Sequence, residues 1–166
     1  MDGDMINRML VVVLIVVSLG VSLASSEESG ASFGGVIGSV NGLSAKMWLN
    51  PTTALDGALS FSTVGSFFGL YLHTDFLMHE FAAAKVEKGR LPLYWGVGVS
   101  LQATDKTNNV GIRVPLGAAY ILDKAPIDVF VELVPTLGVT APVSFNFTGE
   151  LGIRYSFSAP KDNDKK

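Results

Sequence analysis

The sequence predicts an all-β protein, an eight-stranded antiparallel up-and-down transmembrane β-barrel preceded by a signal peptide. Three observations predict it. Short segments in which apolar and polar residues alternate follow one another along the chain, and turn residues separate them. The 18 glycines and the abundant Val, Leu, Phe and Thr favour strands, and only one long apolar run occurs, near the N-terminus. In most segments one face is apolar and uncharged, whereas the other mixes glycines with charges.

Residues 1–24 are predicted to be a secretory signal peptide. The stretch from Met5 to Leu23 contains one cation, Arg8, and an apolar core of about a dozen residues, which is short for a spanning helix. Small residues around Ala24 supply a cleavage site, so we expect the mature chain to begin just after it. The alternative is an uncleaved anchor helix, and the first two methionines are both candidate starts.

The composition of the mature chain excludes several classes of function. Without Arg8, Asp2 and Asp4 the 12 basic and 15 acidic side chains become 11 and 13, a net charge of −2, so nothing indicates nucleic acid as a partner. The absence of cysteine excludes disulfides, thiolate metal sites and a cysteine nucleophile. A mature length of about 142 residues suits one domain.

The first half of the chain contains four predicted strands in which apolar residues take every second position. Asn41-Gly42 is a strong signal for a tight hairpin between the first two strands, and Asn50-Pro51 ends the second. The strands are Phe33–Gly38, Leu43–Leu49, Ala54–Ser62 and Phe68–His79.

The second half begins with the longest connection, Ala82–Arg90, which could hold a helical turn. A polar loop, Asp105–Asn109, and a turn, Asp123–Pro126, separate the strands that follow. The last four predicted strands are Leu93–Ala103, Val110–Leu122, Ile127–Val139 and Gly149–Phe157.

The last predicted strand carries Glu150-x-Gly152-x-x-Tyr155-x-Phe157. This pattern resembles the polar-x-Gly-x-x-aromatic-x-aromatic signal by which bacterial outer-membrane β-barrels are recognised for assembly. The resemblance implies that these four residues bind the barrel-assembly machinery. The chain departs from the family by continuing past the final aromatic residue with a charged C-terminal tail, residues 158–166.

The difference between the two strand faces predicts which one meets lipid. The interior of an eight-stranded barrel is only wide enough for side chains to fill it, so glycines must offset large residues there. Charged residues also fit the interior, because Arg or Lys facing mid-bilayer costs about 2–4 kcal/mol. The uncharged face then fits lipid, with aromatic residues near strand ends: Trp95, Tyr120, Tyr155 and Phe157.

The whole mature chain resembles the small OmpA/OmpX-type outer-membrane barrels. The resemblance implies a barrel domain, residues 33–157, behind a periplasmic lead-in, residues 25–32, with both termini on the periplasmic side. It also implies outer-membrane lipids as partners, and we expect a monomer. A soluble periplasmic β-barrel binding protein or sandwich is the alternative, because soluble strands also alternate.

Alternation places a set of charged side chains on the inner face. We interpret them as an internal network of salt bridges, because buried charges need partners; the alternatives are a proton or ion path and a binding site. With a loop at 140–142, antiparallel pairing sets Asp128 opposite Arg154, and Glu132 opposite Glu150. Lys46 or Arg113 could reach that acidic pair. The network is predicted to contain Lys46, Asp56, His73, Asp75, Arg113, Asp128, Glu132, Glu150 and Arg154, with His79 on the same face.

No catalytic, metal or cofactor site is predicted. His73 and His79 share a strand face, but at the rise of a strand they lie about 20 Å apart, too far to bind one metal. No serine lies in a nucleophile motif. The predicted outer loops are short, so there is little material for a receptor tip or plug. We therefore expect a structural or envelope-stabilising membrane protein, with a narrow pore as the alternative and an outer-membrane enzyme as a third class.

Overall fold

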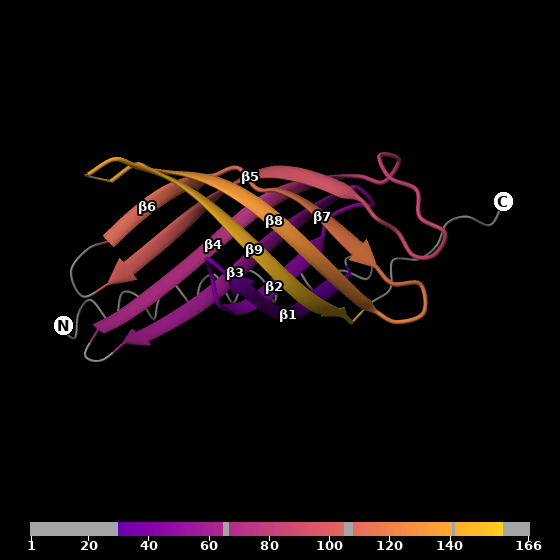
Figure 1. Ribbon diagram of the computed structural model, residues 1–166, viewed down its shortest axis with the longest axis horizontal. Helices are drawn as coiled ribbons and strands as arrows, with labels where there is room; N and C mark the ends of the chain where they lie inside the picture. The colour runs from indigo at the N-terminus through magenta and orange to yellow at the C-terminus, as the bar shows by residue number, and fades with distance from the viewer. Residues whose placement is uncertain (1–29, 65–66, 105–107, 141, 158–166) are drawn as a thin grey trace.

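The strands of this protein close into one antiparallel barrel (Figure 1). The structure, a computed structural model, describes residues 30–64, 67–104, 108–140 and 142–157. The predicted signal peptide, most of the lead-in and the C-terminal tail lie outside the described residues. No helix in the described part of the chain has the length and hydropathy of a membrane span.

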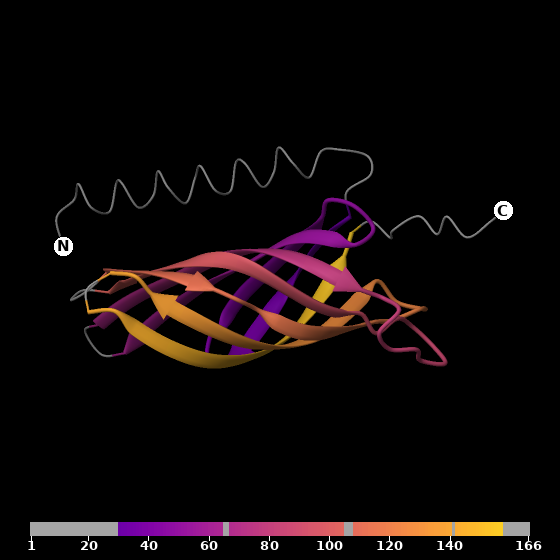
Figure 2. The same cartoon turned by 90° about the horizontal axis from the view of Figure 1, so that it is seen from above.

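Strands that follow one another in the chain pair antiparallel, except the sixth and seventh, which both pair with the fifth and the eighth. The first strand pairs with the last. The seam between them runs from Ser32 opposite Ser156 to Gly38 opposite Glu150. In Figure 2 the strands enclose one elongated barrel and cross its long axis obliquely. The strands are β1 (Ala31–Gly38), β2 (Gly42–Trp48), β3 (Thr53–Val64), β4 (Phe67–Glu80), β5 (Leu93–Thr104), β6 (Asn108–Arg113), β7 (Leu116–Ile121), β8 (Ile127–Gly138) and β9 (Ser144–Ser156).

The strands β6 and β7 together form the predicted sixth strand, which is interrupted at Pro115. Arg113 ends β6 and Leu116 begins β7, three positions apart, and their β5 partners Gly98 and Trp95 are also three apart. The register is therefore unbroken across the interruption. Proline has no N–H to donate to the neighbouring strand, which accounts for the gap in the ladder. The wall is that of an eight-stranded barrel in which one strand is divided.

The structure differs from the sequence-based expectations at the last strand and at the connection after β4. The last strand starts at Ser144 rather than Gly149, because β9 keeps pairing with β8 up to Gly138. The long connection after β4 contains bends and no helical turn. It is held instead by an isolated bridge between Arg90 and Ile121, so it follows the rim of the barrel.

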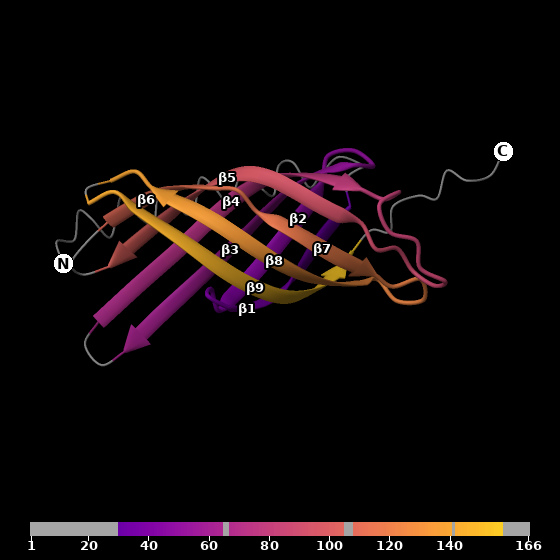
Figure 3. The same cartoon turned by 45° about the horizontal axis from the view of Figure 1, so that its top comes forward.

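The two ends of the barrel differ. One end holds the start of β1 and the end of β9, together with the connections at 49–52, 81–92 and 122–126. The opposite end holds the turn at 39–41 and the β3–β4, β5–β6 and β8–β9 connections. Figure 3 shows the β3–β4 hairpin and the long β4–β5 connection at these opposite ends. We call them the terminal end and the distal end.

The inner and outer faces follow the predicted alternation. On β5, Tyr94 is buried, whereas Trp95 and Val97 on either side of Gly96 are more than half exposed on the outside. Space inside is made by glycine: an added Cβ at Gly152 would collide with the Phe130 ring. Side chains therefore pack the interior at this level, and most large apolar residues face outward, although some, such as Leu77 and Phe130, are buried inside.

Candidate functional site

The charged residues predicted for the interior are all buried. The exposed fraction is 0% for Arg113, 2% for Arg154 and 1% for Glu132. The remaining predicted members are buried as well: Lys46, Asp56, His73, Asp75, Asp128 and Glu150, as is His79.

Arg154 on β9 is the centre of one cluster. Its Nη2 donates to both carboxylate oxygens of Asp56 on β3, at 2.8 and 2.7 Å, and its Nε donates to Ser44 Oγ at 2.8 Å. The guanidinium carbon also lies 3.7 Å from the centre of the Phe130 ring, a cation–π distance. Asp128, on the adjacent strand, is the weaker partner, with its Oδ1 3.8 Å from Nη1. Arg154 thus connects β9 to β2, β3 and β8.

Arg113 on β6 is the centre of a second cluster. Its Nε donates to both carboxylate oxygens of Asp75 at 3.1 Å, and its Nη1 donates to the Tyr71 hydroxyl. The same Nη1 lies 3.5 Å from Glu150 Oε1 on β9. His73 Nε2 lies 3.7 Å from Asp75 Oδ2 on the same face of β4. This cluster therefore joins β4, β6 and β9 across the interior.

Lys46 and aromatic rings fill the interior toward the terminal end. Lys46 Nζ lies 2.7 Å from His79 Nε2 and 4.3 Å from the centre of the Trp48 ring. The His79 ring in turn lies 4.4 Å from the Trp48 ring and 5.0 Å from the Tyr94 ring. Phe81, at the start of the long connection, packs beside Trp48 at 6.1 Å. These side chains occupy the lumen at this level.

The β8–β9 register is the predicted one. Asp128 pairs with Arg154, and Glu132 pairs with Glu150. Of the two cations that could reach the acidic pair, Arg113 contacts Glu150. Glu132 instead accepts a hydrogen bond from the Tyr94 hydroxyl at 2.7 Å, a partner that the register does not show.

The interior is not neutral by charge count. Among the described residues, its buried members include three cations, at Lys46, Arg113 and Arg154, against five carboxylates. Several buried polar atoms have no hydrogen-bond partner in the described part of the chain, including Arg113 Nη2 and His73 Nδ1. No group of His, Asp and Glu among the described residues has the geometry of a metal site.

The four residues of the predicted assembly signal lie on β9 and just beyond it, on both faces. Glu150 and Gly152 face inward, whereas Tyr155 and Phe157 are exposed on the outside. The Phe157 ring lies 5.2 Å from the Tyr155 ring and 5.9 Å from the Phe33 ring on β1. The two aromatic residues therefore form an outward patch at the seam.

Comparison with known proteins supports the fold. A scan against the models of known protein families finds no match, and a search of curated proteins finds none either. Among solved structures, the barrel is similar to the N-terminal β-barrel domain of Pseudomonas aeruginosa OprF, with a TM-score of 0.56 and 14% sequence identity. The similarity covers 78% of this chain and 98% of that domain. The predicted OmpA-type barrel fold is confirmed.

Sequence reasoning missed the aromatic and hydroxyl partners of the charges. Tyr71, Tyr94 and Ser44 all lie at inward-facing positions, so alternation placed them in the interior. What alternation cannot give is the partner of a side chain that crosses the lumen. From the sequence, only pairs of residues that face each other on adjacent strands could be predicted.

Proposed function

We propose that this protein is an integral outer-membrane barrel with a structural, envelope-stabilising role. The observation that supports membrane insertion is that the two faces are reversed relative to a soluble protein. The charges lie inside and the large apolar side chains lie outside. On β9 the outward residues Leu151, Ile153 and Tyr155 are about half exposed. Soluble monomers rarely expose contiguous apolar patches larger than a few hundred Å², which argues against the soluble binding-protein alternative.

Two aromatic belts support the same proposal. Near the terminal end, Trp95, Tyr120, Tyr155 and Phe157 are exposed on the outer face, and near the distal end Phe61, Phe145 and Phe147 are. Tyr155 and Phe147 are eight positions apart on one strand. At about 3.3 Å per residue and a tilt of about 40°, they lie roughly 20 Å apart along the axis, close to the ~25 Å apolar band of outer-membrane barrels.

The structural role rests on the filled interior. The guanidinium groups of Arg113 and Arg154 span the lumen and are almost fully buried, and Lys46 with its aromatic neighbours fills the next level. A water-filled channel would leave such groups hydrated. The proposal therefore assigns the protein neither a pore nor a catalytic activity.

Membrane insertion can be tested by fractionation and gel mobility. The protein should be recovered with outer membranes and migrate differently with and without boiling, because a closed, fully hydrogen-bonded barrel resists detergent until heated. Recovery in the soluble periplasm after osmotic shock would contradict the proposal.

The choice between a structural role and a pore needs a separate measurement. In planar lipid bilayers the purified barrel should show no discrete conductance steps. An Arg113→Ala, Arg154→Ala double variant removes the two side chains that cross the lumen. It serves as the control in which the lumen is widened. Steps of equal size in the wild type and this variant would establish the pore. Cells that lack the protein should also become more sensitive to detergent, and unchanged sensitivity would contradict the envelope role.

A further inference from the structure

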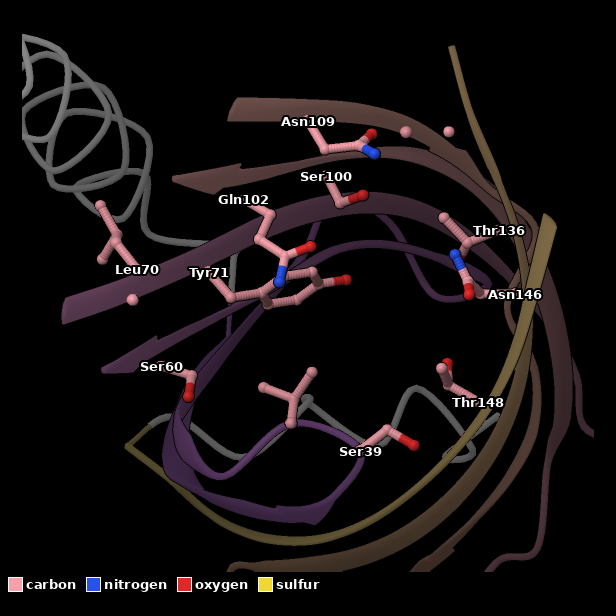
Figure 4. Close-up of a pocket in the computed structure, with 14 residues that line it drawn as sticks. Ser39, Ser60, Leu70, Tyr71, Ser100, Gln102, Asn109, Thr136, Asn146 and Thr148 are labelled. Atoms are coloured by element: carbon pink, nitrogen blue, oxygen red, sulfur yellow. The ribbon is translucent and has the colours of Figure 1, made fainter. Parts of the chain in front are cut away.

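The distal end of the barrel contains a cavity of about 330 Å³. Figure 4 shows side chains from several strands directed toward a common space, with Tyr71 and Gln102 on one side and Asn146 and Thr148 on the other. The residues that line it include hydroxyl, amide and phenol groups, and none of them is ionisable to a charge near neutral pH. The charged residues of the interior begin on the side of this cavity that faces the terminal end.

Glycine creates this space. A Cβ at Gly111 would lie 2.7 Å from Ser100 Oγ and 2.9 Å from Thr136 Cγ2, so a larger residue would fill this side of the cavity. Arg113, the next inward position after Gly111, is already bound by Asp75 and by the Tyr71 hydroxyl. Tyr71, which lines the cavity, thus contacts the Arg113 guanidinium through its hydroxyl.

The cavity presents unused hydrogen-bonding groups. Gln102 and Asn146 lie at exposed positions on the cavity lining, and no hydrogen bond joins either side-chain amide to another described residue. Each amide offers two N–H donors and a carbonyl acceptor. The hydroxyls of Ser60 and Thr148 donate to the backbone carbonyls of Asn41 and Val134, and their lone pairs remain available as acceptors. Donors and acceptors therefore line the same cavity as the Tyr71 ring.

We propose that this cavity binds a small, neutral, polyhydroxylated solute, about the size of one free sugar ring. Each ligand hydroxyl both donates and accepts, as the free amides and the hydroxyls of the lining do, and the apolar face of Tyr71 suits the C–H face of such a ring. The lining offers an ionic ligand no opposite charge. The volume is at the lower end of the ~300–1,000 Å³ of small-molecule sites. This binding function goes beyond the structural role proposed above, which assigns no ligand.

The test is a titration of the folded barrel in phosphocholine micelles, which carry no sugar headgroup. Glucose and myo-inositol are the probes, and backbone amide NMR signals are the readout. Saturable shifts should be confined to the turn at 39–41 and the distal ends of β3, β4, β5, β6, β8 and β9. A Gln102→Leu, Asn146→Leu double variant should weaken binding about tenfold or more, because two hydrogen bonds to the ligand are lost.

Asn108→Leu is the matched control. Asn108 is exposed and precedes the cavity residue Asn109 on β6, so its side chain faces away from the cavity. This variant should bind like the wild type. Thr136→Val, which keeps the side-chain shape, replaces the double variant if heat-dependent gel mobility shows that the latter is unfolded, and it should weaken binding severalfold.

Three outcomes would overturn the proposal. The first is the absence of saturable shifts with both probes. The second is equal binding by the wild type and the cavity variants. The third is tighter binding of glucose 6-phosphate or inorganic phosphate than of glucose, which would assign the cavity to an anion held by Arg113.

Discussion

Glu132 on β8 and Glu150 on β9 lie directly opposite each other, and each carboxylate has a different donor, from a strand that does not pair with its own. Tyr94 donates to Glu132 at 2.7 Å, and Arg113 lies 3.5 Å from Glu150. Two facing carboxylates repel each other, so each donor offsets part of that repulsion. The excess of interior carboxylates over cations therefore has its most direct effect at this pair, as repulsion between two facing carboxylates.

Replacing one of these carboxylates should stabilise the barrel. In Glu132→Gln the amide oxygen still accepts the Tyr94 hydrogen bond, while the like-charge repulsion is removed. We expect the temperature midpoint of the gel-mobility shift to rise, corresponding to a gain of about 0.2–1 kcal/mol. Tyr94→Phe is the counterpart, and it should lower the midpoint. A lower midpoint in Glu132→Gln would show that the charge itself is needed.

Removing Arg154 should be costly, and the choice of the compensating mutation should reveal its main partner. Arg154→Met leaves the buried Asp56 and Asp128 unpaired, at a cost of up to about 3–5 kcal/mol. Adding Asp56→Leu should recover more of the loss than adding Asp128→Leu, because Asp56 accepts two hydrogen bonds at 2.8 and 2.7 Å. The same heat-dependent gel shift measures all the variants. Equal recovery from both, or strictly additive losses, would contradict these contacts.

Two glycines on β9 should differ sharply in their tolerance of alanine. A Cβ at Gly152 would collide with the Phe130 ring and lie 2.8 Å from the Gly35 carbonyl oxygen, so Gly152→Ala should cost about 1–3 kcal/mol. At Gly149 the nearest atom, Leu133 Cδ2, is 3.8 Å away, an ordinary contact. Gly149→Ala is therefore the control and should fold like the wild type. Similar midpoints for both variants would mean that the interior is looser than described.

The C-terminal aromatic residues should matter for assembly more than the tail that follows. Tyr155→Ser with Phe157→Ser removes the outward patch at the seam and should abolish insertion, measured as the amount of heat-shifting protein in outer membranes. Deletion of residues 158–166 should leave the amount unchanged. Equal losses from both changes would refute the role of Tyr155 and Phe157 as an assembly signal.

The sequence predicted the strand order, the two faces and the β8–β9 register, because all three follow from local alternation and turn length. The pairing of Asp128 with Arg154 came from the same reasoning. Position 115 shows its limit: the divided strand could be anticipated only from the missing N–H of proline, and the pattern of apolar residues continues through it.

The contacts inside the barrel could not be predicted in the same way. Arg154 reaches past β1 to Ser44 on β2 and Asp56 on β3, and Tyr94 reaches from β5 to Glu132 on β8. Such partners depend on which non-adjacent strands the closed barrel brings close together, and the local alternation of apolar and polar residues does not contain that information. The distal cavity was missed for the same reason, since it arises where inward residues of several strands are small or neutral together.

The seam between β1 and β9 joins the two ends of the polypeptide. Ser32 and Ser156 are 124 positions apart and share a hydrogen bond between their hydroxyls. A chain that is made from its N-terminus must therefore keep its first strand unpaired on one edge until the last strand has been delivered. Contacts over such a separation are the slowest to form. Closure of the wall must therefore wait for the last strand to be made, and a truncated copy that lacks β9 has no partner for this edge of β1.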